Sequence, residues 1–310
     1  MTERFCDIGG GITLCYETFG NEADPPMVLV MGLGTQMLGW PEEFCEQLAG
    51  RGFHVVRFDN RDIGRSTRIP GRPPPVGQLL RRRIWPVHYD LGDMAGDVAG
   101  LLAKLGLAPA HVVGASMGGM IAQTLAARHP ELVRSLVSIM SSTGSRWSGQ
   151  PAFRTYPFFL RRAPEDRDRY IEQVTRVFAA IGSTGLPHDT ERVRDMVARS
   201  YDRGHDPDGP GRQLAAIIAS GDRTAELRTI KVPTLVIHGS KDRMVALSGG
   251  KATARAIPGA RMMVVHGMGH DLPEAAWPQL IAAIAERADV ADRAAGRDER
   301  AGAGAPLNAP

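Results

Sequence analysis

Short apolar runs rich in valine, leucine and isoleucine alternate with amphipathic segments along this 310-residue chain, and this alternation restricts its fold more than any other feature. Parallel strands need a crossover between them, usually a helix, so a repeated strand–helix–strand order predicts a parallel sheet with helices on both faces. We therefore expect an α/β fold with a mostly parallel sheet, preceded by a hairpin at residues 5–17. The expected strands are residues 27–31, 54–58, 111–113, 136–140, 234–238 and 262–265, and the expected helical segments are 36–50, 90–105, 117–128, 246–256 and 273–287.

The alternation is interrupted by a long segment, residues 142–230, that contains no convincing buried strand. Seven of the fourteen Phe and Tyr residues of the chain lie in it, and its apolar residues recur at helical spacing. We expect a helical cap inserted into the sheet domain. The expected cap helices are residues 165–181, 189–203 and 211–220.

The expected domain division follows from this interruption. Residues 1–141 and 231–287 form the two parts of the core, and residues 142–230 form the cap. From residue 288 the chain is rich in Ala, Arg, Asp and Gly and has few bulky apolar residues. Such a segment cannot bury enough surface to order itself, so we expect residues 288–310 to be disordered.

Composition indicates in which compartment the protein is expected to work. Hydrophobic residues make up 43% of the chain and charged residues 23%, which is typical of a globular protein. No apolar run approaches the roughly 20 residues that span a bilayer, and the first residues lack the apolar stretch of a signal peptide. Three cysteines at unrelated spacings, Cys6, Cys15 and Cys45, suit a reducing compartment. We expect a cytoplasmic protein without a membrane partner.

Positive charge is concentrated in residues 61–83, which hold seven arginines and one aspartate although the whole chain carries only +3. Arg81–Arg83 suggest a patch for nucleic acid or an acidic partner. The stretch lacks interleaved aromatic residues and lies beside Pro73–Pro75, which mark a loop. We favour a solvated loop and expect no nucleic-acid partner.

The strongest chemical signal is Gly114-Ala-Ser-Met-Gly118, which fits G-x-S-x-G and lies between a β-rich run and a helical segment. A sharp strand-to-helix turn strains the serine backbone and points its hydroxyl out of the sheet. Glycines on both sides allow neighbouring backbone to pass closely. This context predicts Ser116 as a nucleophile.

A serine hydroxyl needs a base, and the base needs an orienting acid. His270 follows the last expected strand, where the chain returns to the edge of the sheet that carries Ser116, and His266 is the main alternative. Asp242 lies just beyond the strand at 234–238, whereas residues 140–142, at the end of the preceding sheet strand, offer no carboxylate. The resulting order, Ser116, Asp242, His270, is that of α/β hydrolases.

The negative oxygen that forms during acyl transfer needs hydrogen-bond donors already in place. We expect the backbone N–H groups of Met117, next after the nucleophile, and Leu33, in the loop after the first parallel strand. Gly32-x-Gly34 does not continue into a dinucleotide fingerprint, because Met37 occupies the place of the third glycine. With no metal-binding or phosphate-binding motif in the sequence, we expect no metal and no cofactor.

Over roughly residues 5–287 the chain resembles the α/β-hydrolase superfamily. Residues 58–66, FDNRDIGRS, resemble the family segment D-x-R-G-x-G-x-S, with Asp62 where glycine often stands, and we interpret them as a structural loop. The segments GWPEEF, HVVGASMGG, VPTLVIHG and GMGHDLP are similar to a bacterial esterase branch that includes the aclacinomycin methylesterase type and related carboxylesterases. Met31 departs from the His-Gly that is usual in the wider family, but backbone donors do not depend on that side chain.

The sequence thus predicts a serine carboxylic-ester hydrolase that acts on small to medium apolar esters through an acyl-enzyme. Cap aromatics such as Phe158 and Phe159 are expected to line the substrate pocket. The same three residues also suit a lactonase, a C–C bond hydrolase or a perhydrolase, and a ligand-binding receptor with slow turnover. The sequence leaves the oligomeric state open.

Overall fold

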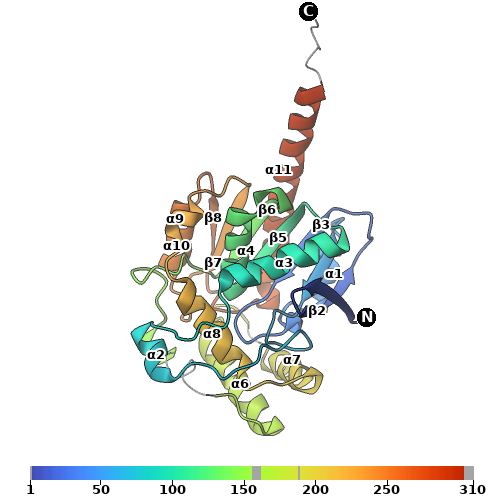
Figure 1. Ribbon diagram of the computed structural model, residues 1–310. Helices are drawn as coiled ribbons and strands as arrows, with labels where there is room; N and C mark the ends of the chain where they lie inside the picture. Colours follow the sequence, from blue (N-terminus) through green and yellow to red (C-terminus); the bar gives the residue numbers. More distant parts are fainter. Residues whose placement is uncertain (1, 156–161, 188, 304–310) are drawn as a thin grey trace, which may run out of the picture.

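The computed structural model describes residues 2–155, 162–187 and 189–303, and Figure 1 shows their arrangement. The expected residues Phe158 and Phe159 lie outside the described residues.

One eight-stranded sheet, in the order β1-β2-β4-β3-β5-β6-β7-β8, forms the centre of the molecule. The β1–β2 and β2–β4 pairs are antiparallel, and every pair from β4–β3 to β7–β8 is parallel. The expected hairpin and mostly parallel sheet are both confirmed. The strands are β1 Arg4–Gly9, β2 Ile12–Phe19, β3 Pro26–Val30, β4 His54–Phe58, β5 Ala110–Ala115, β6 Val133–Ile139, β7 Thr234–Gly239 and β8 Arg261–Val265.

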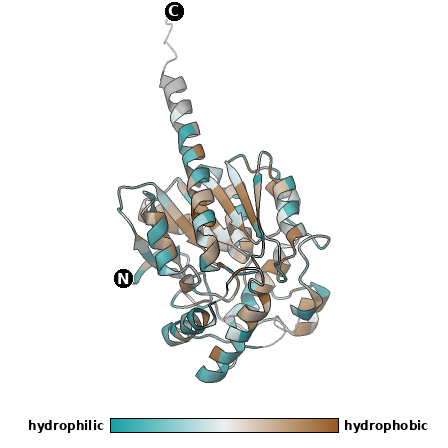
Figure 2. Cartoon of the chain, turned by 180° about the vertical axis from the view of Figure 1, so that it is seen from behind, coloured by the Kyte–Doolittle hydropathy of each residue, from teal (hydrophilic) through white to brown (hydrophobic). Residues whose placement is uncertain are grey.

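Helices cover both faces of the sheet, because the central strands are apolar on both sides. In β3, Val28 packs with the helices of one face and Leu29 with those of the other. Figure 2 shows the strands as largely hydrophobic between helices whose outward sides are hydrophilic. The first face carries α3 Leu91–Leu105, α4 Met117–Arg128 and α10 Leu247–Ala256, and the second carries α1 Glu42–Ala49 and α11 Trp277–Ala303.

Local sequence signals set the ends of α3. The Asp90 side chain accepts hydrogen bonds from the N–H groups of Gly92 and Asp93, and the Asp93 carboxylate accepts one from the N–H of Asp90. This capping box satisfies N–H groups that have no partner within the helix. Gly106 ends the helix with φ +67°, a conformation that glycine adopts without strain.

The segment between β6 and β7 is helical, as expected, and its helices α6, α7 and α8 gather below the sheet in Figure 1 together with α2. All three expected helices of this segment are confirmed within a few residues. The bounds are α2 Val76–Arg81, α6 Arg167–Ile181, α7 Thr190–Arg203, α8 Gly209–Ser220 and α9 Thr224–Leu227, with short 3-10 turns at Met37–Gly39, Pro130–Leu132, Phe153–Thr155 and Glu274–Ala276.

The expectation of a disordered tail is wrong for residues 288–303, which continue helix α11 away from the body of the molecule. Two small residues, Ala288 and Ala291, are buried against the domain. Beyond them, an Ala-, Arg- and Glu-rich segment adds turns to a helix that already exists, so it avoids the cost of nucleation. Residues 304–310 lie outside the described part of the chain. Among the helices that the structure describes, none has the length and hydropathy to cross a membrane.

Candidate active site

Ser116 occupies a sharp turn between β5 and α4, with φ +56° and ψ −120°. A side chain at Gly114 would overlap the carbonyl group of Gly118, and one at Gly118 would overlap the carbonyl group of Val30. Gly114 is therefore required for the turn itself, and Gly118 is required for the turn to pack against β3. The strained serine projects from the end of the strand, as the G-x-S-x-G pattern predicts.

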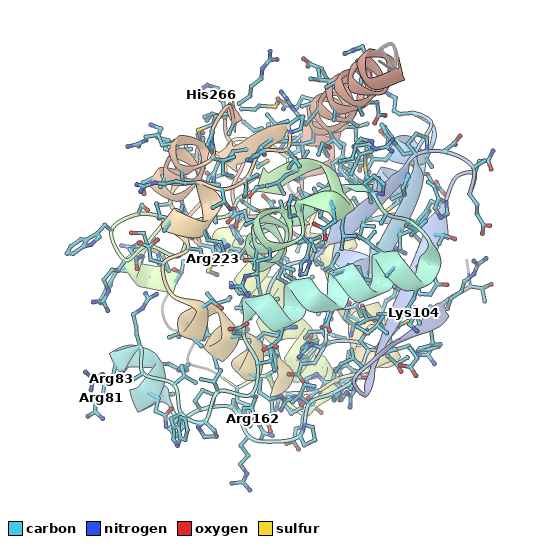
Figure 3. All side chains as sticks on the ribbon, turned by 45° about the horizontal axis from the view of Figure 1, so that its top comes forward. Arg81, Arg83, Lys104, Arg162, Arg223 and His266 are labelled. Atoms are coloured by element: carbon cyan, nitrogen blue, oxygen red, sulfur yellow. The ribbon has the colours of Figure 1, made fainter. Side chains whose placement is uncertain are left out.

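His270 joins Ser116 to Asp242 through two hydrogen bonds. Its Nε2 lies 2.9 Å from Oγ of Ser116, and its Nδ1 lies 2.8 Å from Oδ2 of Asp242. The loop after β8 supplies His270, and the backbone N–H of this residue donates to the carbonyl oxygen of Ile181 in α6, 2.9 Å away. The structure thus brings together the three predicted side chains from three strand ends. The alternative base, His266, is exposed and lies at the outer surface of the molecule (Figure 3).

The side chain of Asp242 is fully buried and held in one orientation. Its Oδ1 accepts the backbone N–H groups of Met244 and Val245 at 2.9 and 2.8 Å, which leaves Oδ2 for His270. His238, at the end of β7, lies 3.5 Å from Oδ2 and 2.8 Å from the carbonyl oxygen of Val245. Burial lowers the pKa of His238 below its usual value, which favours the neutral ring beside the aspartate. The sequence identified this histidine only as a strand residue.

The two expected backbone donors flank Ser116. Met117 begins α4, and the loop that carries Leu33 packs so closely that a Cβ at Gly32 would lie 3.0 Å from Cβ of Ser116. Within the described residues, the N–H groups of Leu33 and Met117 have no hydrogen-bond acceptor. Both residues line the same cavity as Ser116. Two unpaired donors beside a nucleophile can stabilise a developing negative oxygen.

A residue that the sequence did not single out, Gln213 of α8, holds this loop in place. Its Oε1 accepts the N–H of Gly34 at 2.9 Å, and its Nε2 donates to the carbonyl oxygen of Arg61 at 2.8 Å. The side chain is completely buried. One amide therefore connects the helical segment, the loop of Leu33 and the FDNRDIGRS segment.

The FDNRDIGRS segment has a structural role, consistent with its interpretation from sequence. Asp62 has φ +70°, which explains why glycine is common at this position in the family. Its buried carboxylate accepts hydrogen bonds from Tyr89 Oη at 2.6 Å and from Arg212 Nη2 of α8 at 2.8 Å. Asp59 pairs in the same way with Arg203 of α7, 2.9 Å away. The segment ties two helices of the insertion to the sheet domain.

A cavity of about 1740 Å³ opens at Ser116 and His270. Its apolar walls come from α2, α6 and α8. Of the aromatic residues of the insertion, Tyr170 and Phe178 line it, whereas Phe153 is 89% exposed. The apolar lining residues from these helices are Val76, Leu79, Leu80, Tyr170, Val174, Val177, Phe178, Ile181, Leu214, Ile217 and Ile218.

A family model for the α/β hydrolase fold matches residues 25–274. The chain belongs to the α/β-hydrolase family. It is similar to two rhodomycin D methylesterases, DnrP of Streptomyces peucetius (27% identical) and DauP of Streptomyces sp. strain C5 (29% identical), and both alignments cover 88% of this chain and 94% of the relative. The expected resemblance to a bacterial esterase branch is confirmed.

Solved structures agree on the fold of this hydrolase. An enol-lactonase from Burkholderia xenovorans LB400 has a TM-score of 0.71 at 24% identity, and the match covers 92% of this chain and 99% of the lactonase. A hydrolase from Pseudomonas aeruginosa PA01 has a TM-score of 0.67 at 26% identity, covering 91% and 96% of the two chains. The α/β-hydrolase architecture is therefore shared over nearly the whole length.

Proposed function

We propose that this hydrolase cleaves carboxylic esters with Ser116 as nucleophile, His270 as general base and Asp242 as the group that orients the base. The continuous hydrogen-bond chain through the three side chains carries the proposal. A carboxylate only accepts hydrogen bonds, so Nδ1 of His270 carries the proton that points at Asp242. Nε2 is then free to accept the proton of Ser116.

The reaction proceeds in two halves. Ser116 Oγ attacks the ester carbonyl carbon while Nε2 of His270 takes the hydroxyl proton, and Asp242 stabilises the resulting imidazolium. His270 returns the proton to the departing alcohol oxygen, which leaves an acyl group on Ser116. A water molecule then attacks the acyl carbon with His270 again as base, and Ser116 is regenerated as the acid departs.

The N–H groups of Met117 and Leu33 bind the negative oxygen of each tetrahedral intermediate in this proposal. Their lack of other acceptors in the described chain supports the assignment. Fixed donors of this kind stabilise the transition state without reorganisation, and loss of one side-chain donor costs about 10²- to 10³-fold in kcat in other hydrolases.

We infer that the substrates are apolar esters with a small alcohol group, methyl esters among them. Apolar walls around Ser116 and the similarity to methylesterases support this substrate class. The cavity of about 1740 Å³ exceeds the roughly 300–1000 Å³ of common small-molecule sites. It leaves room for acyl groups at and above the upper end of the small-to-medium range that the sequence predicts.

The test is an activity panel of p-nitrophenyl esters, methyl esters and lactones, run with the wild type and with Ser116→Ala. We expect ester turnover that falls about 10⁴- to 10⁶-fold in the variant, with the fold unchanged, as for other serine nucleophiles. Preferential turnover of lactones would replace the ester assignment by a lactonase. Binding without turnover would indicate a receptor, and activity of Ser116→Ala within tenfold of wild type would exclude Ser116 as nucleophile.

A further inference from the structure

Two segments at the mouth of the cavity expose large apolar side chains to solvent. We call residues 70–88, which include α2, and residues 144–155, which follow β6, the rim. Both segments line the cavity, the first through α2 and the second through residues 149–151. Seven large apolar side chains are exposed in the described chain, and six of them lie in the rim. These are Val76, Leu80, Trp85, Val87, Trp147 and Phe153, of which Trp85 is 80% and Trp147 90% exposed.

The rim is also uniformly positive. It contains six arginines and no aspartate or glutamate. By contrast, Arg61 and Arg65 of the same arginine-rich stretch are paired with Asp97 and Glu3. Figure 3 shows Arg81, at the end of α2, and Arg83, just after it, pointing away from the body of the molecule. The rim arginines, none of which forms an ion pair within the described chain, are Arg72, Arg81, Arg82, Arg83, Arg146 and Arg154.

The combination of exposed tryptophans, aliphatic side chains and unpaired arginines is typical of protein surfaces that bind a membrane interface. Tryptophan and leucine enter the boundary between headgroups and acyl chains, and arginines contact anionic headgroups. Solvation alone explains the arginines but not six exposed apolar side chains gathered on one rim. Tryptophan and arginine are also frequent in interfaces with proteins, but a protein surface usually carries charges of both signs. An anionic membrane carries negative charge only and therefore complements a rim that carries positive charge only.

We propose that the rim binds the surface of an anionic phospholipid membrane and admits apolar esters from it into the cavity. The delivery of esters rests on the proposed function, but membrane binding does not depend on it. The expectation of no membrane partner rests on the absence of a spanning segment, and surface binding needs none. The rim forms part of the lining of this cavity, so a membrane-dissolved ester held at the rim lies next to the entrance and need not cross water.

Intrinsic fluorescence tests the proposal, because the four tryptophans of the chain fall into two classes. Trp40 and Trp277 are buried, at 0% and 3% exposure, so a change in environment on membrane binding reports Trp85 and Trp147. We expect a blue shift on addition of vesicles of phosphatidylcholine with phosphatidylglycerol, and none with phosphatidylcholine alone. The shift should disappear in Trp85→Phe/Trp147→Phe and weaken at high salt.

Co-sedimentation with the same vesicles measures the contribution of the arginines. Arg81→Gln/Arg83→Gln should weaken binding about 30-fold, since each arginine near an anionic surface contributes about a fivefold factor. Arg51→Gln/Arg228→Gln removes the same charge from two exposed positions outside the rim and should bind like the wild type. Equal loss in both variants, equal binding to neutral vesicles, or no binding at all would overturn the proposal. Binding to heparin with no tryptophan shift on vesicles would also overturn it, in favour of a general polyanion site.

Hydrolysis of soluble p-nitrophenyl acetate separates this proposal from the proposed function. Ser116→Ala should bind vesicles as the wild type does. If vesicle binding is absent and soluble turnover persists, only the membrane proposal fails. If the wild type binds anionic vesicles but never turns over an ester, the proposed function fails and the rim assignment stands.

Discussion

Replacing Gln213 by alanine should slow ester hydrolysis although the side chain is remote in sequence from Ser116. Its amide fixes the loop of Leu33 through Gly34 and fixes α8 to the carbonyl of Arg61. The substitution leaves the N–H of Gly34 and the carbonyl oxygen of Arg61, both on half-buried residues, without these partners. A buried unsatisfied group costs about 1–3 kcal/mol, and water partly reaches these two half-buried groups, so we expect a total loss of about 1–3 kcal/mol in the free energy of unfolding.

The expected kinetic effect is smaller than the loss of a donor and falls mainly on kcat. Removal of an oxyanion donor costs about 10²- to 10³-fold in kcat, and a loop that moves but keeps its N–H retains part of that stabilisation. We expect kcat to fall about 10- to 100-fold with little change in KM. A trifluoromethyl ketone, which forms a negative tetrahedral adduct with the serine, should lose affinity by the same factor.

Gln123→Ala is a matched control for destabilisation. Gln123 is equally buried and also makes two side-chain hydrogen bonds, to Ser138 and Arg223, but none to the loop of Leu33. Both variants should lose stability in urea unfolding, and only Gln213→Ala should lose kcat and inhibitor affinity when folded. If Gln213→Ala turned over esters within threefold of wild type, or if Gln123→Ala lost as much kcat, Gln213 would not position the loop of Leu33 for catalysis.

Three further predictions follow from the site. Asp242→Asn and His270→Ala should each lose most of their steady-state activity, and neither should add much to the loss in Ser116→Ala, because the three side chains act as a unit. His266→Ala should lose little activity. The reverse result for the two histidines would assign the role of base to His266. Across a p-nitrophenyl ester series, kcat/KM should rise until the cavity is full, with each methylene lowering the activation free energy by about 0.8 kcal/mol. Phe178→Ala should shift the optimal acyl length, whereas a flat profile would contradict an apolar acyl site. Arg212→Met should cost about 3–5 kcal/mol in urea unfolding, because the buried Asp62 loses its counter-charge, and a loss below 1 kcal/mol would show that the pair does not hold α8 to the core.

The sequence predicts the regular elements well because their signals are local. Strand β3 is a short apolar run, and α3 has both helical spacing and capping residues. The side chains of Ser116, Asp242 and His270 are also predictable, since each follows a strand end and their order is that of the family. The geometry adds what the pattern lacks, namely that His270, and not His266, reaches the serine.

Contacts between distant segments could not be predicted in the same way. Gln213 lies 179 residues from Gly34, and nothing in an amphipathic helix marks one glutamine as buried. The role of Arg212 depends on how α8 docks against Asp62. The error at residues 288–303 has a different origin, because a low content of bulky apolar residues excludes an independent core but not the extension of an existing helix.

Covalent labelling tests whether Ser116 is the nucleophile. Cleavage after Lys104 and Arg128 releases a peptide in which Ser116 is the only serine, so its modification can be assigned by mass. An organophosphate should inactivate the enzyme with one equivalent bound to this peptide, and His270→Ala should react far more slowly because the hydroxyl lacks its base. A fully active enzyme whose label lies on another residue, or that resists the reagent altogether, would contradict the account.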